Sequence, residues 1–156
     1  MSALQRMIGM VLRPLAERQA RGRTGEAFAA ALERSGSVVQ GRFERAGDTP
    51  GNREAINHIV GIERWGQRRL RVALGEPPVS DAYRGYRLPE GTDLKALAQA
   101  FTETRRETVR LALELGRADP GLKTRVAHND LGELSVGGWL AYLGAHASRE
   151  QFRVRG

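Results

Sequence analysis

Apolar residues recur at intervals of three and four along most of the chain, which is the spacing of one face of an α-helix. Turn signals, chiefly glycine and proline, divide this pattern into five segments. The segments cover residues 2–20, 24–45, 53–74, 92–115 and 136–154. No stretch alternates with a period of two for long enough to predict a strand. The pattern therefore predicts an all-α protein, and long one-sided helices predict a bundle.

Residues at the segment ends suggest where the helices begin and break. The candidate N-caps are Thr24, Asn52, Thr92 or Asp93, and Ser135. Pro14 lies inside the first segment and is expected to kink or interrupt it. Residues 122–133 are expected to form an irregular connection before the last helix.

Residues 76–91 form the longest connection and show no periodicity. Tyr83 and Tyr86 lie in it among glycines and prolines. A loop of this length in a bundle is commonly functional or mobile. Tyr83 and Tyr86, together with His128 from the later connection, are candidates for the border of a substrate pocket. The alternative for His128 is a solvated loop side chain.

Composition indicates one globular, soluble domain, because 156 residues with 40% hydrophobic and 28% charged content can bury a real core. The absence of cysteine excludes disulfides and a protein thiol nucleophile. No apolar run approaches the ~20 residues of a membrane span. The apolar run at residues 7–12 is too short for a signal peptide. The expected location is the cytoplasm, with no membrane partner.

The formal net charge is +7, which raises nucleic-acid binding as one interpretation. The basic residues are nearly all arginine and are scattered, with only local pairs and no long basic block. A nucleic-acid binder of this charge would lose affinity steeply with salt. Without a basic stripe, we expect no specific nucleic-acid partner.

Candidate chemistry centres on the histidines. His146 and Glu150 fall on the same helix face as Trp139 and Leu143, so both are expected to point into the bundle. An imidazole and a carboxylate one turn apart can ligate one metal ion; the alternative is a buried hydrogen-bonded pair without metal. His58 lies on an apolar helix face, where it is either a satisfied core residue or a third ligand.

Three stretches, in this order and spacing, resemble the DinB/YfiT-like superfamily. They are NREAINHIVGIERW (52–65), HNDLGELSVGGWL (128–140) and AHASREQ (145–151). The likeness covers about residues 24–154. It implies an up-down-down-up four-helix bundle over residues 23–156, with residues 1–22 as an additional N-terminal helical arm. The arm is expected to pack across the bundle, cover a dimer surface or close the pocket.

The resemblance also implies a divalent metal, often zinc or nickel, held by one histidine of the second bundle helix and two residues of the last. Carried over here, the ligands are His58, His146 and Glu150. Glu150 departs from the family pattern, in which most members have histidine. Two histidines and a carboxylate still make a workable catalytic set with an open position. The alternative is a member that has lost its metal.

Relatives of this type transfer or isomerise small molecules with a low-molecular-weight thiol, and many form homodimers. The implied function is therefore a thiol-dependent transferase or isomerase acting on an unknown small-molecule substrate. The competing hypothesis is a metal-free bundle that serves as a stress-related binding or dimerisation module. The family name refers to induction by DNA damage, which describes expression and not a contact with DNA.

Overall fold

The computed structural model describes residues 2–156, and this part of the chain forms five α-helices and one β-hairpin. The helices are α1 (Ala3–Ala20), α2 (Gly25–Glu44), α3 (Pro50–Val72), α4 (Leu94–Arg117) and α5 (Val136–Glu150). Short 3-10 helices are η1 (Tyr83–Tyr86), η2 (Gly121–Lys123) and η3 (Gln151–Arg153). The expected all-α class is confirmed, apart from the hairpin.

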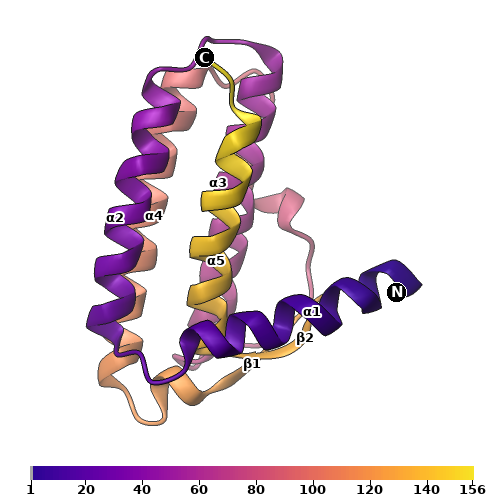
Figure 1. Ribbon diagram of the computed structural model, residues 1–156, viewed down its shortest axis with the longest axis vertical. Coiled ribbons are helices and arrows are strands. Elements are labelled where there is room, and N and C mark those ends of the chain that lie inside the picture. Colours follow the sequence, from indigo (N-terminus) through magenta and orange to yellow (C-terminus); the bar gives the residue numbers. More distant parts are fainter. Residues whose placement is uncertain (1) are drawn as a thin grey trace.

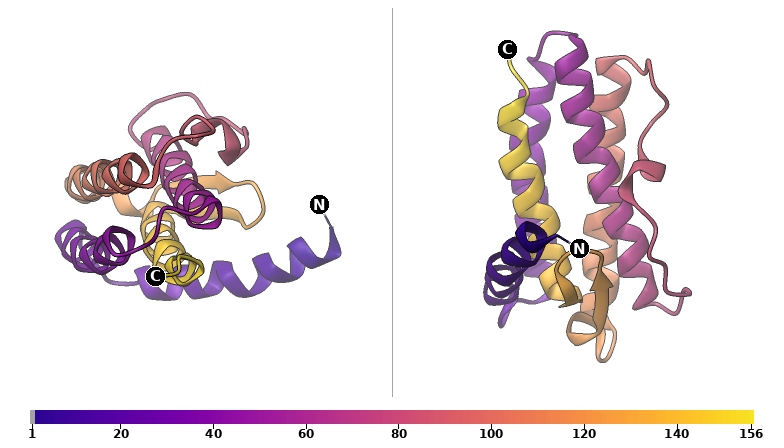
Figure 2. Two further views of the ribbon diagram at one scale, coloured as in Figure 1. Left: turned by 90° about the horizontal axis from the view of Figure 1, so that it is seen from above. Right: turned by 90° about the vertical axis from the view of Figure 1, so that its right-hand side faces the viewer.

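Helices α2 to α5 lie side by side as an elongated bundle (Figure 1). In this view α2 and α5 run upward, whereas α3 and α4 run downward. Because α3 and α4 point the same way, residues 73–93 must travel back along the bundle to connect them. Figure 2 shows this segment, here called the strap, running beside α3.

The strap is anchored to α3 at two places. Near its start, Arg69 pairs with Asp81 at 2.8 Å, and the Trp65 indole N–H donates to the Asp81 carbonyl at 3.0 Å. Near its end, the Asn57 side chain donates to the Leu88 carbonyl at 3.1 Å and accepts from its N–H at 2.9 Å. These contacts place η1 against the outer face of α3.

Three predicted N-caps are confirmed by the hydrogen bonds that their side chains accept: Thr24, Asp93 and Ser135. The prediction for Asn52 is wrong. Helix α3 begins earlier, with Thr49 as the cap and Pro50 in its first turn, where a missing N–H costs nothing. Asn52 instead lies buried and binds both the N–H and the carbonyl of Arg155, fixing the C-terminal segment.

Helix α1 crosses one end of the bundle and extends beyond it (Figures 1 and 2). It continues through Pro14, so the expected interruption does not occur. Gly9 and Ala16 are its buried residues, and a Cβ at Gly9 would lie 2.9 Å from the Asp130 carbonyl oxygen. Gly9, Ala16 and the partly buried Leu12 therefore face the rest of the molecule, whereas most of the large apolar side chains are exposed.

Five of the exposed apolar residues form what we call the α1 stripe, and each of them is 44–65% exposed. They are Leu4, Met7, Ile8, Val11 and Leu15. Leu12 of the same helix instead packs against the core, so α1 is partly packed on its own bundle and partly exposed.

The expectation of no strands is also wrong. Residues 125–135 form an antiparallel hairpin of β1 (Arg125–His128) and β2 (Gly132–Ser135). Each strand has only four residues, too few to establish an alternating pattern in the sequence. Gly132 turns the chain with a φ of 74°, and the Trp139 indole N–H donates to the Val126 carbonyl at 3.0 Å. The hairpin is thereby tied to α5.

Within the described residues, no helix is long and apolar enough to cross a membrane. The apolar core instead lies between the helices, where aromatic and aliphatic side chains such as Trp139, Phe43 and Phe101 are almost fully buried. This packing holds α3 against α5 and brings their facing histidines together.

Candidate metal centre

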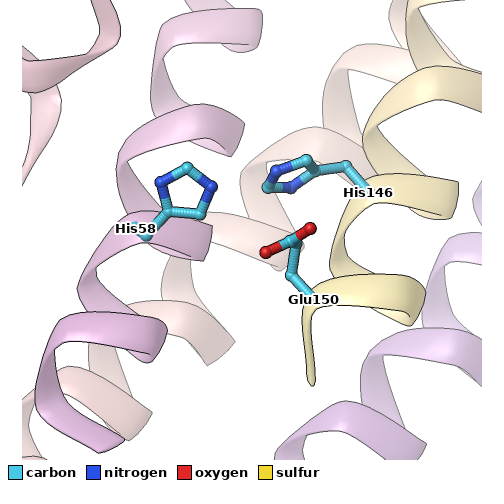
Figure 3. A group of neighbouring side chains, drawn as sticks. All are labelled: His58, His146 and Glu150. Carbon is cyan, nitrogen blue, oxygen red and sulfur yellow. The ribbon is translucent and has the colours of Figure 1, made fainter. Parts of the chain in front are cut away.

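The structure brings His58, His146 and Glu150 together, and we call them the His–Glu cluster (Figure 3). His58 projects from α3, whereas His146 and Glu150 project from α5, one turn apart. One potential ligand atom from each residue lies within 4.8 Å of the other two. The convergence expected from the sequence is therefore present in the folded chain.

The ligand atoms of the cluster must move slightly closer together to coordinate one metal ion. Zinc bonds of about 2.0–2.2 Å to these ligands place tetrahedral donor atoms about 3.4 Å apart. Side-chain rotation can supply such a contraction, because the imidazole rings of His58 and His146 already lie 5.2 Å apart, centroid to centroid. The donor set also leaves a coordination position open, as catalytic sites do.

Burial keeps both imidazoles neutral. Burial, together with the adjacent His58, lowers the pKa of His146 to about 3. His58 is half-buried, and its pKa is also lowered by burial, an effect that the nearby Glu150 only partly offsets. Neutral imidazoles have the free lone pair that a metal ligand needs.

Glu150 supplies the negative charge of the cluster. Burial raises the pKa of this carboxyl, but the hydrogen bond from Arg153 and the hydrogen bond and charge of Arg149 lower it overall. The Arg153 guanidinium lies 3.0 Å from one oxygen and that of Arg149 3.3 Å from the other. Glu150 is therefore ionised at neutral pH and shared with two arginines.

Two aromatic side chains border the cluster. The Tyr83 ring, in η1, packs edge-on against His58 with 5.3 Å between centroids. Tyr142 lies one turn before His146 on α5, with 6.0 Å between centroids. Sequence reasoning missed Tyr142, although positions 142, 146 and 150 follow a four-residue spacing. Burial raises the pKa of Tyr142 to about 12, so it is a neutral hydroxyl at physiological pH.

A cavity of about 60 Å³ lies between α1 and α5 and reaches His146. It is lined by Leu12, Leu15, Ala16, Gln19, Tyr142, Ala145, His146 and Arg149. The first four belong to α1, so this helix closes the cluster on one side.

The other two candidate pocket residues lie outside the cluster. The Tyr86 hydroxyl donates to Asp81 at 2.7 Å and helps to hold the strap. His128 is buried rather than solvated, and its Nδ1 accepts the backbone N–H groups of Asp130 and Leu131. Its ring packs against those of three aromatic residues: Trp65, Trp139 and Tyr142. Burial lowers the pKa of His128 to about 4, so it stays neutral.

Arg87, in the strap, is a further residue that the sequence did not indicate. Its Nη2 lies 3.5 Å from His58 Nδ1, and its Nη1 lies 3.0 Å from a carboxylate oxygen of Glu54. Glu54 is one turn before His58 on α3. The Arg87 guanidinium therefore contacts Nδ1 of His58, and the Glu54 carboxylate binds that guanidinium.

Comparison of the chain with family models, with curated proteins and with solved structures finds no match. The DinB-like resemblance therefore stays a prediction. The functional argument depends on the geometry of the His–Glu cluster and its neighbours.

Proposed function

We propose that His58, His146 and Glu150 bind one divalent metal ion, with zinc or nickel the expected ions. The observation that carries the proposal is the convergence of the three ligand atoms within 4.8 Å across two helices. Two neutral imidazoles and an ionised carboxylate are a donor set that both metals accept. A buried, hydrogen-bonded His–Glu pair does not account for it, because no hydrogen bond joins Glu150 to either histidine among the described residues and Glu150 instead pairs with arginines.

We further propose that the chain is a DinB-like enzyme. The order of helix directions, with α3 and α4 parallel and joined by the strap, is the up-down-down-up arrangement that the resemblance implies (Figure 1). The cluster lies on α3 and α5, the second and last bundle helices, which are the helices that the resemblance assigns to the ligands. These two agreements support the family proposal.

The proposed reaction class is a transfer or isomerisation that uses a low-molecular-weight thiol. When bound, the metal would lower the pKa of a thiol or of water and present it as a nucleophile. The chain has no cysteine, so a thiol must come from a cofactor. The Tyr142 ring lies beside His146 and the Tyr83 ring packs against His58, so these two residues border the proposed site.

Metal analysis tests the proposal. Protein purified without chelator and titrated with zinc or nickel should bind one ion per chain, and His146→Ala should abolish this binding. His128→Ala is the matched control, because it removes the one histidine outside the cluster; circular dichroism checks that both variants fold. A wild-type protein that binds neither metal would contradict the proposal.

The α1 stripe favours a second candidate, in which the chain is a homodimer or a binding module, with or without metal. Leu4, Ile8, Val11 and Leu15 follow the four-three-four spacing of a coiled-coil seam and are all exposed. The flanking positions Gln5, Met7 and Pro14 carry no charge, so they place no like charges beside the seam. Monomeric proteins rarely expose a continuous apolar surface of this kind.

A further inference from the structure

The two ring nitrogens of His58 face different surroundings. One points toward His146 and Glu150, whereas the other is turned away from them (Figure 3). The nitrogen turned away is Nδ1, which lies 3.5 Å from Arg87 Nη2. Nε2 is therefore the atom that faces the proposed metal position.

The contact with Arg87 favours one tautomer of His58. A guanidinium has only donors, so the contact with Arg87 is a hydrogen bond when Nδ1 is the nitrogen with the free lone pair. In a neutral imidazole the proton then lies on Nε2. This tautomer of His58 cannot ligate a metal through Nε2.

Metal binding requires the opposite tautomer of His58. With its lone pair given to the metal, Nε2 has no proton, and the proton moves to Nδ1. Nδ1–H would then face the N–H groups of Arg87, a contact between two donors. Metal-bound histidines normally donate this N–H to a carboxylate or a carbonyl. The carboxylate next to His58 is that of Glu54, one turn earlier on α3, and Arg87 holds it at 3.0 and 3.3 Å.

We propose that Arg87 is a latch on the metal centre: it competes with the metal for His58, and its displacement lets Glu54 accept the Nδ1–H of the metal-bound histidine. The proposal rests on the proposed metal function. In these terms Arg87 and Glu54 are positioning residues that act through His58.

The surroundings of Arg87 fit this role. A Cβ at Gly61 would lie 2.8 Å from Arg87 Cγ, so the glycine makes room for the stem of the arginine on α3. The guanidinium carbon lies 5.3 Å from the Tyr83 ring centre, and Nε is buried without a partner. The next residue, Leu88, is fixed by two hydrogen bonds with Asn57, one donated by each residue. The backbone is therefore held, and the latch needs only a side-chain rotation.

Zinc calorimetry on metal-free protein tests the latch. Arg87→Met keeps the apolar stem but removes the donors, and it should bind zinc at least tenfold more tightly than the wild type. Glu54→Gln should bind zinc about 10–100-fold more weakly, the usual cost of losing a partner of a metal-bound histidine. Arg84→Met is the matched control, because Arg84 is an exposed arginine of η1, three residues before Arg87. It should leave the affinity unchanged.

The tautomer of His58 is a second readout, from ¹⁵N-detected NMR of its ring. We expect Nε2–H in the metal-free protein and Nδ1–H with zinc bound. Equal zinc affinity of the Arg87→Met and Arg84→Met variants, or Nδ1–H already in the metal-free protein, would overturn the latch while leaving the metal site intact. Failure of the wild type and of Arg87→Met to bind zinc would overturn both proposals.

Discussion

Arg105 and Glu63 form a two-pronged ion pair in the middle of the bundle, with Nε 2.7 Å from Oε1 and Nη2 2.9 Å from Oε2. Both side chains are at most 5% exposed. The Thr108 hydroxyl donates to Oε1 of Glu63, and Arg105 also donates to the Leu32 carbonyl. The pair therefore joins α2, α3 and α4.

Glu63→Gln should destabilise the fold by about 3–5 kcal/mol, because it leaves the arginine charge buried without a counter-charge. Urea unfolding followed by circular dichroism measures the loss. The double variant Glu63→Leu/Arg105→Met should lose less than the single variant, since it removes both charges together. A single variant that loses no more than about 1 kcal/mol, the value of an exposed pair, would contradict this account.

Gly25→Ala should also destabilise the protein, by about 1–3 kcal/mol, the usual cost of overpacking. A Cβ at Gly25 would lie 2.6 Å from the Ala112 carbonyl oxygen and 2.8 Å from Gly116 Cα, so α2 and α4 would have to separate. Gly51→Ala is the control, because nothing lies within 4 Å of a Cβ at that helical position. It should be neutral or stabilising by up to about 1 kcal/mol. Equal effects of the two substitutions would show that the close approach is unimportant.

The metal-free protein should lose stability on mild acidification. The unfolded chain takes up protons on His128 and His146 near pH 6.5, whereas the folded chain does so only near 4 and 3, because burial lowers both pKa values. Below pH 6.5 the unfolded state therefore binds more protons than the folded state. Each of the two histidines then lowers the free energy of unfolding by about 1.4 kcal/mol per pH unit. Burial also lowers the pKa of His58, so this residue likewise makes the folded state less stable as the pH falls.

Between pH 7.5 and 5.5 these two histidines should together cost about 2–3 kcal/mol. Urea unfolding in the presence of a chelator measures the difference. Carboxyl groups contribute little in this window, because they titrate at lower pH. His146→Phe should remove about half of the dependence, and a flat stability profile in the wild type would refute the assignment.

The α1 stripe predicts self-association. Sedimentation velocity should show a dimer of the wild type, and Val11→Glu should shift it to monomer, because it places like charges in the centre of the seam. Glu44→Gln, on α2, is a control that leaves α1 unchanged. A wild type that is monomeric at high micromolar concentration would exclude this dimer. The α1 stripe would then be a surface for a different binding partner.

The helices and most of their N-caps could be predicted because they depend on local order. Three- and four-residue spacing sets a helix face, and Thr24, Asp93 and Ser135 each cap the turn that follows them. The placement of His146 and Glu150 on one helix face follows from the same periodicity. Asn52 was assigned wrongly as a cap, since its partner, Arg155, is distant in the sequence.

Local periodicity thus determined the helices of this protein and the shared face of His146 and Glu150. Only the tertiary structure decided that His58 from α3 meets them, that Arg87 from the strap lies against His58, and that most of the large apolar residues of α1 are exposed. Helical patterning depends on neighbours a few residues apart. These juxtapositions depend on how whole helices and the strap pack, and no spacing along the chain records that packing.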